Sequence, residues 1–126
     1  MINSLMVVDD SATMRKIIAR VISMSGIEVG RLEEASNGDE ALEKLRAARV
    51  DVILCDINMP KMSGTNLVKT IREELPDCKN TKIIMVSAES CQDRIKDVMA
   101  DGADGYITKP FTPEKFQQEL AEFVTV

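Results

Sequence analysis

The sequence predicts an α/β fold built on a parallel β-sheet. Five short strand-like segments alternate with stretches whose apolar residues recur at helical spacing, which is the pattern of repeated strand–helix units. The segments 5–8, 52–55 and 83–86 are wholly apolar, as strands are when helices cover both faces of a parallel sheet. With 126 residues, 44% of them hydrophobic, the chain is long enough for one domain with its own core.

The first half of the chain predicts a central strand, a helix and an edge strand. Apolar residues recur at helical spacing from Met14 to Ile22, and Gly26 is a residue type that favours a helix end. The next strand, about 29–35, is the poorest in apolar residues. Its polar composition predicts a position at the edge of the sheet, where water reaches one side of the strand.

The second and third helices have clear apolar faces. Asn37 is a residue type that favours a helix N-cap, and Ala41, Leu42 and Leu45 follow it at helical spacing. The third helix should turn Leu67, Val68 and Ile71 inward. Both helices are therefore expected to cover the sheet.

The last two helices differ in how firmly they should be held. The fourth, about 91–101, has a thin apolar stripe and is expected to be the most weakly held; the stripe consists of Ile95, Val98 and Met99. Gly102 fits its end. Thr112 and Pro113 predict the start of the last helix, since proline is favoured at the first helical position.

Composition excludes several classes of protein. The net charge of −5 argues against a nucleic-acid groove, and the absence of histidine argues against a zinc site or a histidine triad. The three cysteines are odd in number and lack metal-type spacing, so reduced thiols in the cytoplasm are expected; they are Cys55, Cys78 and Cys91. No signal peptide and no membrane span is predicted.

Reactive residue types follow four of the predicted strands. Asp9 and Asp10 end the first apolar run, and Asp56 ends the third. Ser87 and Lys109 follow the fourth and fifth strands. Groups beyond the carboxyl ends of parallel strands converge on one crevice. Three carboxylates, a hydroxyl and an ammonium in one crevice predict a site that binds a divalent metal and carries a phosphoryl group on an aspartate.

Each of these residues also has an ordinary structural explanation. One acid of the pair Asp9 and Asp10 could cap the first helix, and Asp56 and Ser87 could be turn residues. A single lysine such as Lys109 is usually solvated. The functional interpretation depends on their occurring together, each at a strand end.

The same positions resemble a known family, the receiver domains of response regulators. The resemblance is carried by Val7 to Ser11, by Asp56 with Met59-Pro60 and Gly64, and by two later motifs, Ser87-Ala88 and Lys109-Pro110-Phe111. It covers essentially the whole chain, so residues 1–126 are expected to form a single receiver domain with no attached output domain. It implies a flavodoxin-like, doubly wound five-stranded parallel sheet in the order 2-1-3-4-5 with five helices.

The resemblance implies a role for each acid of the crevice. Asp56 would accept the phosphoryl group. The metal would be Mg²⁺, with Mn²⁺ as an alternative, held by Asp10, Asp56 and the backbone carbonyl of Asn58, while Asp9 would act mainly through water. Hard cations of this kind prefer oxygen ligands.

Further roles follow from the same resemblance. Lys109 and Ser87 would contact the phosphoryl oxygens, and the bond between Lys109 and Pro110 would be cis. Asn58 and Glu89 would control the water that attacks the phosphoryl group. Tyr106, the only tyrosine, would follow Ser87 as a rotamer switch; its ordinary explanation is a half-buried aromatic on an edge strand.

The function implied is two-component signal transduction. A histidine kinase would supply the phosphoryl group, and the protein would catalyse its own phosphorylation and dephosphorylation while acting mainly as a signalling protein. The stand-alone length, Asn58, Glu89 and Tyr106 most resemble the chemotaxis regulators. The expected downstream partner is then a flagellar motor switch protein, together with a phosphatase, and the expected state is a cytoplasmic monomer without nucleic-acid or membrane partners.

Three alternatives remain. A phosphorelay receiver would pass its phosphoryl group to a histidine phosphotransfer protein. An aspartyl-phosphate phosphatase needs a second acid two residues after the nucleophile, where this chain has Asn58. A flavodoxin that binds FMN needs donors after the first strand, where Asp9 and Asp10 would repel phosphate.

Overall fold

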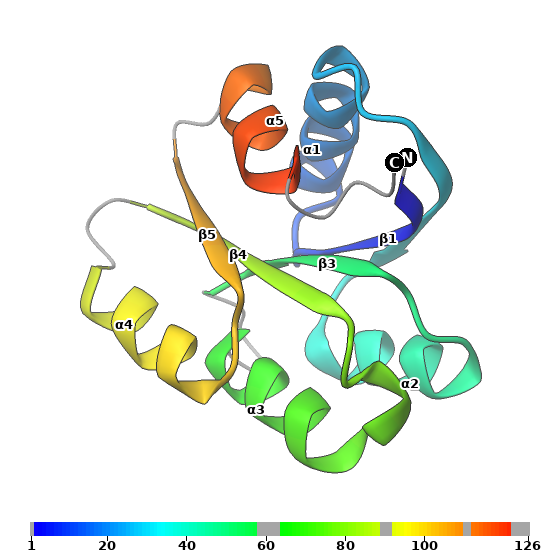
Figure 1. Ribbon diagram of the computed structural model, residues 1–126, viewed down its shortest axis with the longest axis vertical. Helices are drawn as coiled ribbons and strands as arrows, with labels where there is room; N and C mark the ends of the chain where they lie inside the picture. Colours follow the sequence, from blue (N-terminus) through cyan, green and yellow to red (C-terminus); the bar gives the residue numbers. More distant parts are fainter. Residues whose placement is uncertain (1, 58–63, 89–91, 110–111, 122–126) are drawn as a thin grey trace.

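The computed structural model describes residues 2–57, 64–88, 92–109 and 112–121. Strands and helices alternate along the chain (Figure 1). The strands are β1 (Ile2–Val8), β2 (Val29–Ala35), β3 (Val52–Asp56), β4 (Lys82–Ala88) and β5 (Gly105–Lys109). The helices are α1 (Ala12–Met24), α2 (Gly38–Ala47), α3 (Gly64–Glu74), the short 3₁₀ turn η1 (Pro76–Cys78), α4 (Gln92–Asp101) and α5 (Pro113–Ala121).

The strands form one parallel sheet in the order β2-β1-β3-β4-β5. This order confirms the flavodoxin-like topology. The polar strand β2 lies at one edge, as its composition predicts, and β5 lies at the other. The chain reverses its direction of winding between β2 and β3, so the crevice expected at such a reversal lies beyond β1 and β3.

Two layers of helices sandwich the sheet (Figure 1). On one face α1 and α5 pack on alternate strand residues such as Leu5, Leu54 and Ile84. On the other face α2, α3 and α4 pack on the intervening residues such as Met6 and Ile53. Because both faces are covered, the residues of β3 are all buried, which explains the unbroken apolar runs in the sequence.

The helix ends follow from local side-chain chemistry. Ser11 caps α1 by accepting a hydrogen bond from the Met14 amide, and Asn37 caps α2 in the same way. Thr112 accepts a bond from the Lys115 amide at the start of α5. Gly102 follows α4 with φ of +121°, a backbone conformation that residues with a Cβ rarely adopt. These features confirm the predicted starts of α2 and α5 and the predicted end of α4, whereas α1 is capped by Ser11 and not by one of the two acids.

Some predicted core positions are in fact on the surface. Met99 of α4 is 36% exposed, so of the three predicted stripe residues Ile95 and Val98 are the buried ones. Ile17 of α1 is likewise exposed, because it points away from the buried pair Ile18 and Ile22. Among the helices in the described part of the chain, none is long and apolar enough to span a membrane.

Candidate functional site

The pairing of β1 with β3 brings the acids of the crevice together. Val8, the last residue of β1, lies opposite Cys55. Asp9 and Asp56 are each the next residue along the chain, so they leave neighbouring strands at the same level. Because the register of a parallel pair is fixed by the buried residues before it, the apolar sequences of β1 and β3 determine this juxtaposition.

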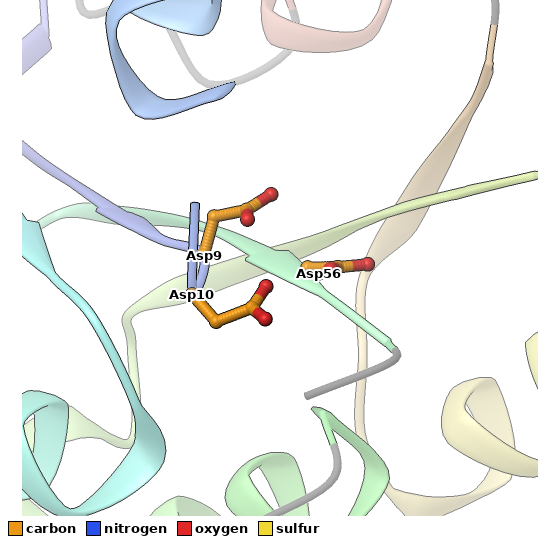
Figure 2. Close-up of side chains that lie close together, drawn as sticks. All are labelled: Asp9, Asp10 and Asp56. Atoms are coloured by element: carbon orange, nitrogen blue, oxygen red, sulfur yellow. The ribbon is translucent and has the colours of Figure 1, made fainter. Parts of the chain in front are cut away.

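The side chains of Asp9, Asp10 and Asp56 converge (Figure 2). One carboxylate oxygen from each residue lies within 4.8 Å of the others. Asp9 is 2% exposed and Asp56 is 9% exposed, whereas Asp10 is on the surface. The cluster is therefore a partly buried acidic pocket with one side open to solvent.

Asp9 is held in place by the start of α1. Its Oδ1 accepts a hydrogen bond of 2.9 Å from the Ser11 amide, and Ser11 then caps the helix. The positive end of the α1 dipole therefore lies beside the acids and favours negative charge there. The two acids have different surroundings as a result: one Asp9 oxygen already accepts a backbone bond, while Asp10 faces solvent.

Arg15 supports the acid pair from outside the cluster. Its Nη1 donates to the backbone oxygen of Asp9 at 2.7 Å, and its Nε donates to Glu34 of β2 at 3.0 Å. The guanidinium thus ties the end of β1 to the edge strand. Sequence reasoning missed this role, because nothing in the local pattern indicates that Glu34 lies opposite the first turn of α1.

Cys55 directly precedes Asp56 in β3 and is paired with Val8, the residue before Asp9. Its thiol is fully buried and donates to the backbone oxygen of Asp56 at 3.3 Å. Burial, and then the negative charges of Asp56 and Asp9, hold the pKa of the Cys55 thiol well above its usual range. The Cys55 thiol therefore stays protonated and adds no charge next to the acids.

The chemistry of this donor set suits a hard divalent cation. Carboxylate oxygens are the ligands that such ions prefer, and like charges this close repel one another unless a cation neutralises them. The described residues contain no thiolate or imidazole in the cluster that would favour zinc instead. The arrangement can hold a metal and present a carboxylate oxygen beside it.

The backbones of Ser87 and Lys109 lie at the same edge of the sheet. Asp56 is paired with Val86, so Ser87 is one residue beyond the level of the acid. Lys109 is paired with Ala88 on the neighbouring strand. The side chains of Ser87 and Lys109 lie outside the described part of the structure.

The remaining predicted residues are not all described. Asn58 and Glu89 lie outside the described residues, and so does Pro110 with its predicted cis bond. Tyr106 is described: it lies on the edge strand β5, and 44% of its surface is exposed. The ring is therefore outside the core in this structure, and Tyr106 lines a groove together with residues of α4 and α5.

Comparison with known proteins agrees with this geometry. The chain is 42% identical to chemotaxis protein CheY1 of Helicobacter pylori over 117 residues, which cover 92% of each chain. It is 37% identical to chemotaxis protein CheY of Thermotoga maritima over 115 residues, covering 91% of this chain and 92% of that protein.

A solved structure has the same fold. Chemotaxis response regulator CheY4 of Vibrio cholerae superposes with a TM-score of 0.83 and 35% identity, over 98% of this chain and 100% of that one. The family model for the response regulator receiver domain matches residues 5–121. These matches, the sheet order and the acid cluster at the end of β1 and β3 place the chain in the response regulator receiver domain family.

Proposed function

We propose that this protein accepts a phosphoryl group on Asp56 from a histidine kinase and thereby switches its binding to a partner protein. The observation that carries the proposal is the cluster of three carboxylates around the end of β3. Asp56 ends β3, which lies between β1 and β4, and its carboxylate lies close to those of Asp9 and Asp10 (Figure 2).

The reaction needs charge neutralisation and alignment more than covalent assistance. An Asp56 oxygen attacks phosphorus, the bond from phosphorus to the imidazole nitrogen of the kinase breaks, and the nitrogen keeps the electron pair. Asp10, Asp56 and the Asn58 carbonyl would hold Mg²⁺, which supplies positive charge to the phosphoryl oxygens when bound. Asp9, already bonded to the Ser11 amide, would act through water.

Ser87 and Lys109 would complete the phosphoryl site. Both backbones lie at the edge of the sheet that carries Asp56. A hydroxyl donor and an ammonium there would bond phosphoryl oxygens and neutralise part of their charge. In dephosphorylation, water attacks phosphorus, the bond from phosphorus to the Asp56 oxygen breaks, and inorganic phosphate leaves as the Asp56 carboxylate is restored. Asn58 and Glu89 would control that water.

The output surface would be formed by α4, β5 and α5. Tyr106 and Ile107 of β5 line a groove there, together with Met99 of α4 and Lys115 of α5. Phosphorylation adds a charge of roughly −1.5 to −2 at Asp56. Ser87 would move toward that charge, and Tyr106 would turn from its exposed position into the space vacated beneath α4.

The proposed pathway is chemotaxis, and the proposed partner is a flagellar motor switch protein. The support is the identity of 37–42% to two chemotaxis proteins over more than nine-tenths of the chain. The second candidate, a phosphorelay receiver, would instead hand the phosphoryl group to a histidine phosphotransfer protein. Capture by a purified motor switch protein only after phosphorylation supports chemotaxis, whereas phosphoryl transfer to a phosphotransfer protein supports the relay.

The phosphoryl acceptor is tested with acetyl phosphate and Mg²⁺, followed by intact mass measurement. The wild-type chain should gain one acid-labile phosphoryl group, and Asp56→Asn should gain none. Asp97→Asn, an exposed acid of α4, is the matched control and should label normally. Full labelling of Asp56→Asn, or labelling of the wild type in excess chelator, would contradict the proposed site or its metal.

A further inference from the structure

Arg72, in the last turn of α3, joins α3 and the adjacent η1 turn to a segment about 30 residues further along the chain. Its Nε donates to the Gly102 carbonyl at 3.0 Å, and its Nη2 donates to Asp104 Oδ2 at 2.8 Å. Its Nη1 reaches the carbonyls of Cys78 and Lys79 at 3.2 and 3.3 Å. One guanidinium therefore connects α3, the η1 turn and the segment between α4 and β5.

Asp104 extends this connection into the sheet. The same Oδ2 atom accepts the amide of Ile83 at 2.9 Å, and the Asp104 amide donates to the Ile83 carbonyl at 2.7 Å. The Arg72–Asp104 pair is charge-assisted and mostly shielded from water, with side chains 21% and 29% exposed. The segment after α4 is thus bonded both to α3 and to the start of β4.

The end of α4 is shaped to receive Arg72. The Ala103 amide donates to Val98 and the Gly102 amide to Met99, the two bonds of a Schellman motif with glycine in the left-handed position. A Cβ on Gly102 would lie 2.8 Å from Arg72 Cγ. The stem of Arg72 therefore packs on the bare glycine backbone while its guanidinium bonds the same residue's carbonyl.

The two ends of α4 lie toward opposite edges of the sheet. Its carboxyl end is bonded to Arg72 at the edge of the sheet where β4 and β5 begin. Its amino end follows β4 and lies toward the edge that carries Asp56 (Figure 1). Among the α4 side chains whose burial is described, Ile95 and Val98 are the buried ones, so these residues offer little apolar area to resist a tilt.

We propose that Arg72 is a positioning residue for the phosphorylation switch: it fixes the carboxyl end of α4, so that a signal at Asp56 displaces the amino end about that fixed point. The proposal rests on the proposed function, because it needs a phosphoryl signal. The proposal adds that the groove lined by Tyr106 changes shape because α4 tilts, while the carboxyl end of α4 stays bonded to α3.

The experiment compares the wild type with Arg72→Met by amide NMR, with and without acetyl phosphate and Mg²⁺. Lys69→Met, an exposed cation of the same helix, is the control. Without a phosphoryl donor, exchange at the amides of Ile83, Ala103 and Asp104 should be about ten-fold faster or more in Arg72→Met. The variant loses the bonds from Arg72 to Gly102 and Asp104, and Asp104 in turn accepts the Ile83 amide. The amides at the end of α1 should exchange as in the wild type.

The signal shifts on phosphorylation are a second measurement. Their distribution along α4 should not depend on Arg72 if this residue only stabilises the fold. In the wild type, amide signals of 93–97 should shift several-fold more than those of 102–104. In Arg72→Met the shifts should extend through 102–104. If Arg72→Met does not fold, Arg72→Lys can be used, because it keeps the aliphatic chain and the charge but loses the planar guanidinium. In Arg72→Lys the signal shifts should also extend through 102–104, to a smaller degree.

Two results would overturn the proposal: equal shifts at both ends of α4 in the wild type, or an unchanged pattern in the Arg72 variants. Uniformly faster exchange, including at the end of α1, would also overturn it, because that indicates a loss of global stability. The donor-free comparison does not depend on Asp56. A chain that takes no phosphoryl group would refute the proposed function and the switch, while the exchange rates at Ala103 and Asp104 would still show whether Arg72 holds α4.

Discussion

The acid cluster should destabilise the protein when no cation is bound. Asp9 and Asp56 are both buried, and their carboxylates lie within 4.8 Å of each other. Asp9→Asn keeps the shape of the side chain and the oxygen that accepts the Ser11 amide, but it removes one of the two buried charges. We therefore expect Asp9→Asn to be more stable than the wild type in the presence of chelator.

The expected gain follows from the geometry. Two unit charges at the 4.8 Å limit repel by about 3.5 kcal/mol if the effective dielectric constant is about 20. Solvent at the open side of the pocket and the other polar partners of Asp9 and Asp56 reduce this value, so a gain of about 2 kcal/mol in the free energy of unfolding is expected. For a chain of this size that corresponds to a rise in Tm of about 8 °C.

The assay is thermal unfolding followed by circular dichroism, in chelator and in excess Mg²⁺. Asp97→Asn is again the control, because it removes one charge from the same net charge of −5 at an exposed position. Added Mg²⁺ should stabilise the wild type by about 2.7 kcal/mol at 100 times its Kd. Mg²⁺ should stabilise Asp9→Asn less. The difference in free energy of unfolding between Asp9→Asn and the wild type should therefore shrink or change sign.

A specific result would refute this reasoning. If Asp9→Asn is no more stable than Asp97→Asn in chelator, then the buried carboxylates do not repel each other as two charges. The cluster would then be neutralised by protons or by hydrogen bonds, and the electrostatic argument for a cation would fail.

Three further outcomes are expected. Asp10→Ala should weaken Mg²⁺ binding more than Asp9→Ala in a metal titration, because Asp10 is exposed and proposed as the direct ligand; equal losses would make that division wrong. Asn37→Ala should cost about 1 kcal/mol in denaturant unfolding through loss of the α2 cap, and an unchanged midpoint would mean that water replaces the cap. Changing Asn58 and Glu89 together should alter the dephosphorylation rate but not Mg²⁺ affinity, and an unaltered phosphoryl lifetime would exclude water control by these residues.

The fold could be predicted because the composition of each strand reflects how far that strand is buried. The apolar runs of β1, β3 and β4 reflect a sheet covered on both faces, and the charges of β2 reflect its edge position. The position of the acids followed from the same pattern, since strand ends converge. Their separation and unequal burial did not, because these depend on the β1–β3 register and on the turn into α1.

The features that sequence reasoning missed depend on contacts between distant residues. Arg72 appears as an ordinary polar residue of a helix, yet it bonds to residues 6 to 32 positions away. Met99 fits the apolar period of α4 but lies on the surface, because the narrow contact with α3 and the sheet is filled by Ile95 and Val98. Such pairings are set by packing between elements, which local periodicity cannot specify.

The buried thiol of Cys55 offers a direct measure of how tightly the sheet is closed around the acids. Only the thiolate reacts with alkylating reagents, and both burial and the neighbouring carboxylates suppress its formation here. Labelling of Cys55 therefore requires β3 to separate from its neighbours, and its rate, followed by mass analysis of the peptide that contains it, measures the frequency of that opening. A cation that binds the three carboxylates should slow this labelling in proportion to its occupancy, without contacting the sulfur at all.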